Sequence, residues 1–308
     1  MHTPVLLHAA VDALALKPDG VYVDATFGRG GHSRLILSGL GECGRLIALD
    51  RDPAAVLSGE AITDKRFCIR HGSFSRVREI LQALEITQID GMLLDLGVSS
   101  PQLEDIARGF SFQSAGPLDM RMDISGGQTA SEWLSTVTES ELERVIKKYG
   151  EERFARQVAR AIIAARTRQP IVTTLQLAGI VTAAVRTRQR DSKRHPATRT
   201  FQAIRIYLNQ ELEELALVLP QCVDLLRPGG RLVVISFHSL EDRMVKQFIR
   251  AAASTDNLPR GVPVREEELQ RFSKQTLRPV GRAIRSDELE VAENVRSRSA
   301  VMRVSERI

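Results

Sequence analysis

The feature that most constrains the fold of this chain is a glycine-rich stretch, DATFGRGGH, at positions 24–32. The apolar run at 20–23 before it is typical of a buried strand, and residues 33–37 after it are typical of the start of a helix. Glycine allows a positive φ and a close approach of the backbone to a ligand. The helix that follows offers unpaired N–H groups at its N-terminus. The stretch, called the glycine turn below, therefore predicts a cofactor site of the nucleotide-binding kind.

Other apolar runs predict a parallel α/β sheet around this turn. Strands are expected at 21–24, 44–49, 67–70 and 89–94, and two more at 230–236 and 299–304. A helical pattern at 2–16 precedes the first strand and further helical patterns separate the first four, and such alternation is typical of parallel sheets. The second intervening helix has a clear start, because Asp52 is a favourable N-cap and Pro53 fits the first helical position.

A long segment without strand signals separates the fourth strand from the fifth. It spans 96–229, whereas a crossover helix with its loops needs only a few tens of residues, so about 100 residues are extra. Its pattern is helical, with a capping box at 138–141, helices at 154–165 and 175–185, and an amphipathic stretch at 200–226 broken at Pro220. We expect an all-helical domain, 104–204, inserted into a sheet domain formed by 1–103 and 205–308.

Positive charge gathers in this expected insert. Fifteen Lys and Arg but only three acids lie between residues 144 and 205, a net +12 in a chain whose total is +5. A basic block inside an otherwise acidic protein favours a nucleic-acid partner. A solvated helix surface is the structural alternative.

The remaining composition bounds the cellular context. The longest nearly apolar stretch, 175–185, is too short to cross a bilayer, and the N-terminus has no signal-peptide pattern. Cys43, Cys68 and Cys222 lack metal-ligand spacing and are interpreted as small buried residues in a reducing compartment. We expect a cytoplasmic protein with no membrane association and no metal site. The sequence is compatible with a homodimer but does not determine the oligomeric state.

Two classes of cofactor fit the glycine turn. A dinucleotide site requires Gly-x-Gly-x-x-Gly, and Ser33 stands where the third glycine would be. Sites for S-adenosylmethionine place an acid four residues before Gly-x-Gly, as Asp24 precedes Gly28 here. Asp50, after the second strand, would accept hydrogen bonds from the ribose hydroxyls in either class. A short last strand fits the antiparallel final strand of methyltransferases, so S-adenosylmethionine is favoured over a dinucleotide.

Four further strings carry a specific resemblance. They are DLGVSSPQ at 95–102, GPLDMRMD at 116–123, HPATRTFQA at 195–203 and SFHSLEDR at 236–243. Together with the glycine turn, and in this order, they resemble the bacterial 16S ribosomal RNA cytosine-N4 methyltransferase (MraW/RsmH) family over nearly the whole chain.

The resemblance implies a Rossmann-like S-adenosylmethionine methyltransferase sheet with an inserted helical domain. It implies methylation of the exocyclic N4 amine of a cytidine in the decoding region of 16S rRNA, within the small ribosomal subunit. The cofactor contacts carried over from the family are Gly30, Gly31, His32, Asp50, Phe74, Asp95 and Gln102. Most of these follow predicted strands, where open α/β sheets bind ligands.

Several roles stay open at this stage. Asp24 either anchors the cofactor's amino group or caps backbone N–H groups, and Phe74 packs on adenine or in the core. Asp95 faces either the adenine amine or the reacting centre. The cytosine amine is a poor nucleophile because its lone pair is delocalised, so an acceptor for one of its protons is expected. His238 and Asp95 are the candidates, with His238 as the catalytic one.

The neighbours of His238 have a structural interpretation of their own. Ser239 and Asp242 resemble a capping box for the following helix, an explanation that does not extend to His238.

Two other functions compete with the methyltransferase. One is an NAD-dependent oxidoreductase, and the other is a non-catalytic RNA-binding assembly factor with a degenerate cofactor fold. The intact glycine turn and Asp50 argue against the assembly factor.

Overall fold

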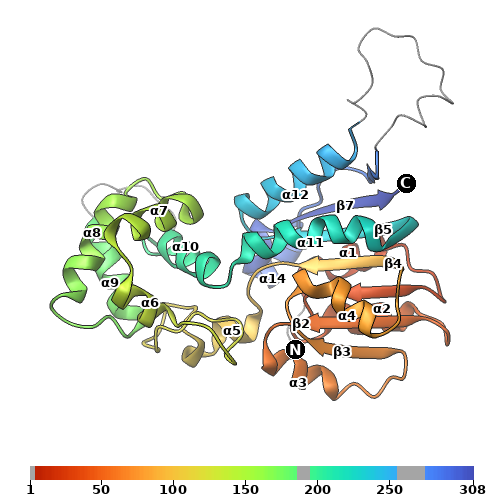
Figure 1. Ribbon diagram of the computed structural model, residues 1–308, viewed down its shortest axis with the longest axis horizontal. Helices are drawn as coiled ribbons and strands as arrows, with labels where there is room; N and C mark the ends of the chain where they lie inside the picture. The colour runs from red at the N-terminus through yellow and green to blue at the C-terminus, as the bar shows by residue number, and fades with distance from the viewer. Residues whose placement is uncertain (1–3, 186–194, 255–274) are drawn as a thin grey trace, which may run out of the picture. The chain divides into compact units, whose positions relative to one another are not determined.

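The computed structural model describes residues 4–185, 195–254 and 275–308 (Figure 1). The chain divides into two compact units: unit 1 combines Met1–Gly97 with Leu212–Ile308, and unit 2 is Val98–Glu211. The bounds expected for the insert, 104–204, fall inside unit 2. Unit 2 begins and ends a few residues beyond them.

Unit 1 is built on a seven-stranded sheet with the order β3-β2-β1-β4-β5-β7-β6. The strands are β1 (Val21–Asp24), β2 (Arg45–Asp50), β3 (Phe67–His71), β4 (Ile89–Asp95), β5 (Leu226–Ser236), β6 (Leu277–Pro279) and β7 (Val301–Arg307). The first five are parallel, and β7 runs antiparallel to β5 and β6. The order confirms the predicted Rossmann-like α/β fold, and β7 is the antiparallel last strand.

One helix precedes the first strand of unit 1 and others follow between its strands. They are α1 (Leu7–Ala13), α2 (Gly31–Gly39), α3 (Pro53–Glu60), α4 (Val77–Ala83), α11 (Glu211–Leu225), α12 (Ser239–Ala252) and α14 (Glu288–Glu293). The start of α3 is as predicted, because the Asp52 side chain accepts the Ala54 N–H at 3.0 Å. The first helix is shorter than the predicted 2–16, because Leu6 has a left-handed backbone (φ 52°) that keeps the helix from starting earlier.

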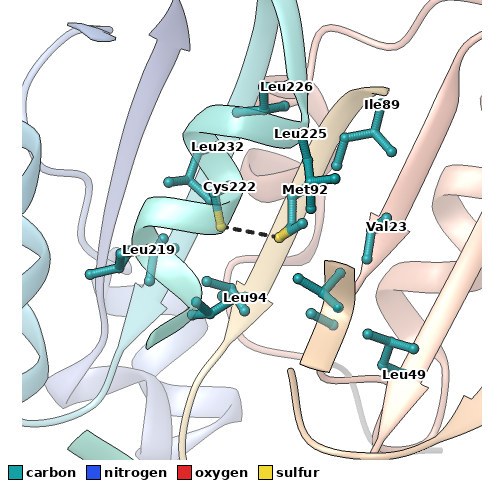
Figure 2. Close-up of a cluster of buried hydrophobic side chains, with 14 of the residues drawn as sticks. Val23, Leu49, Ile89, Met92, Leu94, Leu219, Cys222, Leu225, Leu226 and Leu232 are labelled. Atoms are coloured by element: carbon teal, nitrogen blue, oxygen red, sulfur yellow. Dashed lines mark hydrogen bonds between the residues drawn. The ribbon is translucent and has the colours of Figure 1, made fainter. Parts of the chain in front are cut away.

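The core of unit 1 lies between the sheet and its helices, and Figure 2 shows the part where α11 covers β4 and β5. Cys222 is buried there, with its sulfur 3.3 Å from that of Met92. Burial raises the pKa of the Cys222 thiol to about 12, which leaves it protonated and inert. The prediction of a buried cysteine is confirmed here but wrong for Cys43, which is exposed.

Unit 2 is helical in its described part. Its α-helices are α5 (Ser100–Glu104), α6 (Ala130–Thr136), α7 (Glu139–Gly150), α8 (Ala155–Arg166), α9 (Thr174–Val185) and α10 (Thr198–Leu208). Thr138 caps α7 by accepting the Glu141 N–H, and α8 and α9 coincide with the helices expected at 154–165 and 175–185.

The helix break predicted at Pro220 is wrong. The helix α11 continues through Pro220, and the interruption lies between α10 and α11, at Asn209 and Gln210. The Asn209 amide bonds the backbone of Met120 and Met122, and Gln210 has a left-handed φ of 51°. These long-range bonds, rather than the missing N–H of a proline, stop the helix.

No helix in the described part of the chain has both the length and the apolar character that a membrane crossing requires.

Candidate active site

Three aspartates end three adjacent strands of the sheet in unit 1. Asp24 is the last residue of β1, Asp50 of β2 and Asp95 of β4. The order of strands reverses between β1 and β4, and open α/β sheets bind ligands outside the carboxyl ends of strands at such a point. The glycine turn leaves β1 at the same edge. The structure thus brings Asp50, Asp95 and the turn together, as the sequence predicts.

The glycine turn itself is left-handed at two positions. Gly28 has φ 57°, and Gly30, the N-cap of α2, has φ 74°. A Cβ built on Gly30 would lie 2.6 Å from the ring of Phe27, which packs in the core. Any other residue would be strained at Gly30 and would also displace this ring.

The close approach at Gly31 involves the N-terminal segment. A Cβ on Gly31 would lie 2.1 Å from the Pro4 side chain. This contact explains the glycine without a ligand. The cofactor role of Gly30 and Gly31 therefore stays a prediction, beside a packing role that the structure supplies for each.

Asp50 ties the glycine turn to the end of β2. Its Oδ2 accepts the Gly28 N–H at 2.7 Å and its Oδ1 accepts the Asp52 N–H at 2.8 Å. Burial raises the pKa of Asp50, and these two bonds act against the shift. A carboxylate oxygen has two acceptor sites, so each retains one for a hydroxyl donor. This geometry suits the ribose contact expected of Asp50.

Asp24 lies beneath the turn and is 1% exposed. Its Oδ2 accepts the Ser33 hydroxyl at 2.6 Å, and its Oδ1 accepts the Thr26 N–H at 3.2 Å. Burial raises its pKa to about 6, and both bonds oppose the rise. The capping role considered for Asp24 is therefore present in the structure. The contribution of Ser33 is not apparent from the sequence, where it marks only the absence of a third glycine.

His32 and Asp95 form a close pair at the site. The distance from His32 Nδ1 to Asp95 Oδ2 is 3.7 Å. Burial lowers the pKa of His32 to about 4, which makes the ring neutral at pH 7, while a backbone contact at Val5 acts in the opposite direction. Burial raises the pKa of Asp95 well above its ordinary value, and the carboxylates of Asp24 and Glu241 raise it further.

Two atoms of this pair have unused hydrogen-bonding capacity. Within the described residues, His32 Nε2 and Asp95 Oδ1 are buried and have no hydrogen-bond partner. Leaving a buried polar atom unsatisfied costs about 1–3 kcal/mol, and such atoms in a native fold commonly mark a functional site. The pair is suited to meet a polar ligand.

His238 caps α12. Its Nδ1 lies 3.3 Å from the Glu241 N–H that it accepts, and its Nε2 lies 3.3 Å from Glu241 Oε1. Glu241 in turn accepts the Phe237 N–H at 2.8 Å. The capping box predicted for Ser239 and Asp242 therefore lies one residue earlier, and Asp242 instead bonds Arg303 at 2.7 Å. The catalytic role of His238 stays a prediction, because both ring nitrogens face a helix-capping partner.

The last two predicted contacts have local roles. Phe74 opens a short 3-10 helix after β3 and packs, partly buried, against the core. Gln102 belongs to unit 2, where its Oε1 accepts the Ser99 N–H at 2.9 Å in a capping box at the start of α5. Their contacts with a cofactor stay predictions.

Some cations of the basic block are engaged in contacts within the insert. Arg205 holds the Glu211 carboxylate with two bonds, of 2.7 and 2.8 Å, and Arg166 donates to the Val137 carbonyl at 2.7 Å. In the described part of unit 2, the exposed cations without an acidic partner include Lys147, Arg153, Arg156 and Arg168. Arg186, Arg188 and Arg190, which the sequence also suggests for RNA binding, lie outside the described residues.

Comparison with known sequences distinguishes the methyltransferase from the two competing predicted functions. A profile of the MraW methylase family matches residues 1–308. The chain belongs to this family. Membership contradicts the oxidoreductase interpretation and favours an enzyme over a non-catalytic factor.

Individual relatives cover the chain from end to end. Ribosomal RNA small subunit methyltransferase H of Nitrosospira multiformis is 66% identical over 307 residues, which is 100% of this chain and 97% of the relative. The protein of the same name from Nitrosomonas europaea is 64% identical, over 100% of this chain and 98% of its own. Among solved structures, an rRNA methylase from Streptococcus thermophilus has a TM-score of 0.43 at 10% identity, covering 100% of this chain and 99% of its own.

Proposed function

We propose that this chain transfers a methyl group from S-adenosylmethionine to the N4 amine of a cytidine in the decoding region of 16S rRNA. Relatives named for small-subunit ribosomal RNA methylation, 66% and 64% identical over the full chain, support the substrate class. The structural observation that carries the proposal is the arrangement of Asp24, Asp50 and Asp95 around the glycine turn. This substrate also implies a cytoplasmic location.

The residues at the carboxyl edge fit this cofactor. Asp50, held by two backbone N–H groups, retains acceptor capacity for the ribose hydroxyls. The unsatisfied Nε2 of His32 offers the cofactor a polar contact beside the turn. When bound, S-adenosylmethionine supplies an electrophilic methyl group on a sulfonium centre.

The chain's own residues at the carboxyl edge have two tasks in this proposal. The glycine turn and Asp50 position the cofactor. These residues contribute through orientation rather than through chemistry. Asp95 is the proposed acceptor for one proton of the target amine, because its Oδ1 is buried and unsatisfied within the described residues. Accepting that proton raises the electron density on the amine nitrogen. The cytidine must leave its base stack to reach the site.

The exposed cations of unit 2 are proposed to hold RNA phosphates. Each phosphate-binding cation that is removed should lower the slope of log affinity against log salt by roughly 0.7–0.9. We expect steep salt dependence for the wild type and a shallower slope for Arg153→Ala/Arg156→Ala.

A homodimer stays a prediction that light scattering would test.

The deciding experiment is methyl transfer. Purified protein is incubated with S-adenosylmethionine labelled on the methyl group and, separately, with 16S transcript, small subunits and large subunits. The label is expected in small-subunit RNA alone, and nucleoside mass spectrometry is expected to identify N4-methylcytidine. Label in another nucleoside, or in no RNA from either subunit, would overturn the proposal.

A further inference from the structure

Unit 1 contains a cavity of about 420 Å³ that the proposed reaction does not use. It lies between the second half of α12, the residues after β6 and the middle of β7. Its apolar lining includes Ile249, Val280 and Val304. Lys246, Arg250 and Arg282 also line it, and all three are exposed. We call it the α12 pocket.

Among the described residues, the cations of the α12 pocket outnumber the acids that neutralise them. Its described lining includes a fourth cation, Arg303, but no Asp or Glu. Arg303 is neutralised by Asp242, with bonds of 2.7 and 3.2 Å. Lys246, Arg250 and Arg282 have no acidic partner within the described ranges of the chain. Three such cations around one cavity create a local positive potential that selects an anion.

The pocket is separate from the candidate active site. The helix α12 begins shortly after the carboxyl end of β5, and in Figure 1 it runs back along the sheet, away from the edge where β2, β3 and β4 end. From Ser239 to Arg250 the helix rises by about 16 Å. A ligand that reaches both places must therefore be extended.

We propose that the α12 pocket binds the phosphate backbone of the substrate RNA, at nucleotides away from the methylated cytidine. This inference rests on the proposed function, which supplies a polyanion long enough to reach it. Guanidinium groups suit phosphate because they present paired donors, and the apolar floor suits the face of a sugar or base. With cations as its main polar groups, the pocket positions RNA without reading its sequence.

Charge reversal at two rim residues tests the proposal. The test variant is Arg250→Glu/Arg282→Glu, and its control is Arg45→Glu/Lys65→Glu. The control changes the net charge equally, at exposed cations near β2 and β3, which lie at the opposite edge of the sheet from β6 and β7. Binding of a fluorescein-labelled 16S transcript is followed by anisotropy over a salt series. We expect the pocket variant to bind at least tenfold more weakly, with a slope of log affinity against log salt lower by about 1–2. The control is expected to stay within twofold of wild type.

Kinetics supply an independent readout. The pocket variant should show a raised KM for RNA, while kcat at saturating RNA and the KM for S-adenosylmethionine change less than twofold. Equal affinities and equal salt slopes for the pocket and control variants would overturn the proposal, even if methyl transfer is intact. Weaker binding of inorganic phosphate by the pocket variant with unchanged RNA affinity would likewise overturn it. Absence of methyl transfer by the wild type, with the RNA-binding difference preserved, would instead contradict only the proposed function.

Discussion

The hydroxyl of Ser33 donates a 2.6 Å hydrogen bond to Oδ2 of Asp24, and both side chains are buried. The bond joins the first turn of α2 to the last residue of β1, across the loop that carries the glycines. Ser33 occupies the position where a dinucleotide fingerprint has its third glycine. In this chain a polar side chain stabilises the turn at that position.

Removing that bond should destabilise the protein. Ser33→Ala leaves Asp24 Oδ2 without its side-chain donor in a buried site, which costs about 1–3 kcal/mol. Urea denaturation would measure the free energy of unfolding. Ser38→Ala is the matched control, because Ser38 lies in the same helix but is exposed, and a change below about 0.5 kcal/mol is expected there. Equal effects of the two substitutions would contradict the role of Ser33.

The raised pKa of Asp24 predicts a pH dependence of stability. With a folded pKa of about 6 against an ordinary value of 3.8, folded protein binds more protons than unfolded protein between these values. Stability from this group is therefore present below pH 3.8 and lost as pH rises through 6. As the pH rises from 4 to 7, the free energy of unfolding of Asp24→Asn should therefore increase relative to that of wild type by up to about 3 kcal/mol.

His32 acts in the opposite direction over an overlapping range. The pKa of His32 in the folded protein, about 4, lies below the ordinary 6.5. Its contribution to stability is therefore present above pH 6.5 and is lost as the pH falls through 4. The free energy of unfolding of His32→Gln should therefore rise relative to that of wild type as the pH is lowered. Parallel pH series on the two variants check the signs, and curves that move in the same direction would contradict the assignment.

Asp50→Asn should weaken cofactor binding. The substitution removes the charge that strengthens the bonds from Gly28 and Asp52, and it weakens the acceptor offered to ribose. A hydrogen bond to a charged group contributes about 1.5–3 kcal/mol, so an increase of at least tenfold in Kd for S-adenosylhomocysteine is expected by calorimetry. Glu60→Gln, at an exposed position at the end of α3, should leave Kd unchanged.

A double-mutant cycle separates the two roles of Gly31. Gly31→Ala places a methyl group against Pro4 and should cost about 1–3 kcal/mol of stability. Much of this loss should be recovered in Gly31→Ala/Pro4→Ala if the contact with Pro4 is its cause. Calorimetry then measures cofactor binding by the double variant. Weak binding in a restored fold supports the predicted cofactor role of Gly31, and normal binding contradicts it.

His238→Asn and His238→Ala distinguish capping from catalysis. Asn is a good N-cap, so it should preserve the stability of α12, whereas Ala should cost about 1 kcal/mol. If His238 accepts a proton in the reaction, both variants lose turnover at saturating substrates. Full turnover by His238→Asn would leave the residue with its capping role alone.

Features specified by neighbouring residues were predictable from the sequence. The Asp52-Pro53 helix start, the Thr138 cap and the first four strands depend on residues a few positions apart, and they lie where the pattern placed them. Predictions failed where a distant contact intervened. Asn209 ends α10 through bonds to residues 120 and 122, which no pattern around Pro220 reveals. The sequence predicts the cap of α12 at Ser239, one residue after the actual N-cap His238, because histidine is not among the preferred N-cap types.

The alternation of strands and helices, the glycine turn and the acids that follow three strands are determined by the sequence itself, since hydrophobic period and turn chemistry are local. Only the tertiary structure decided which of these groups are desolvated and which meet. It buried Asp24 on Ser33, set His32 beside Asp95 and assembled the α12 pocket from three separated segments. Burial and proximity depend on the whole packed unit, so the pKa shifts and unsatisfied atoms that define the candidate site become visible only once the chain has folded.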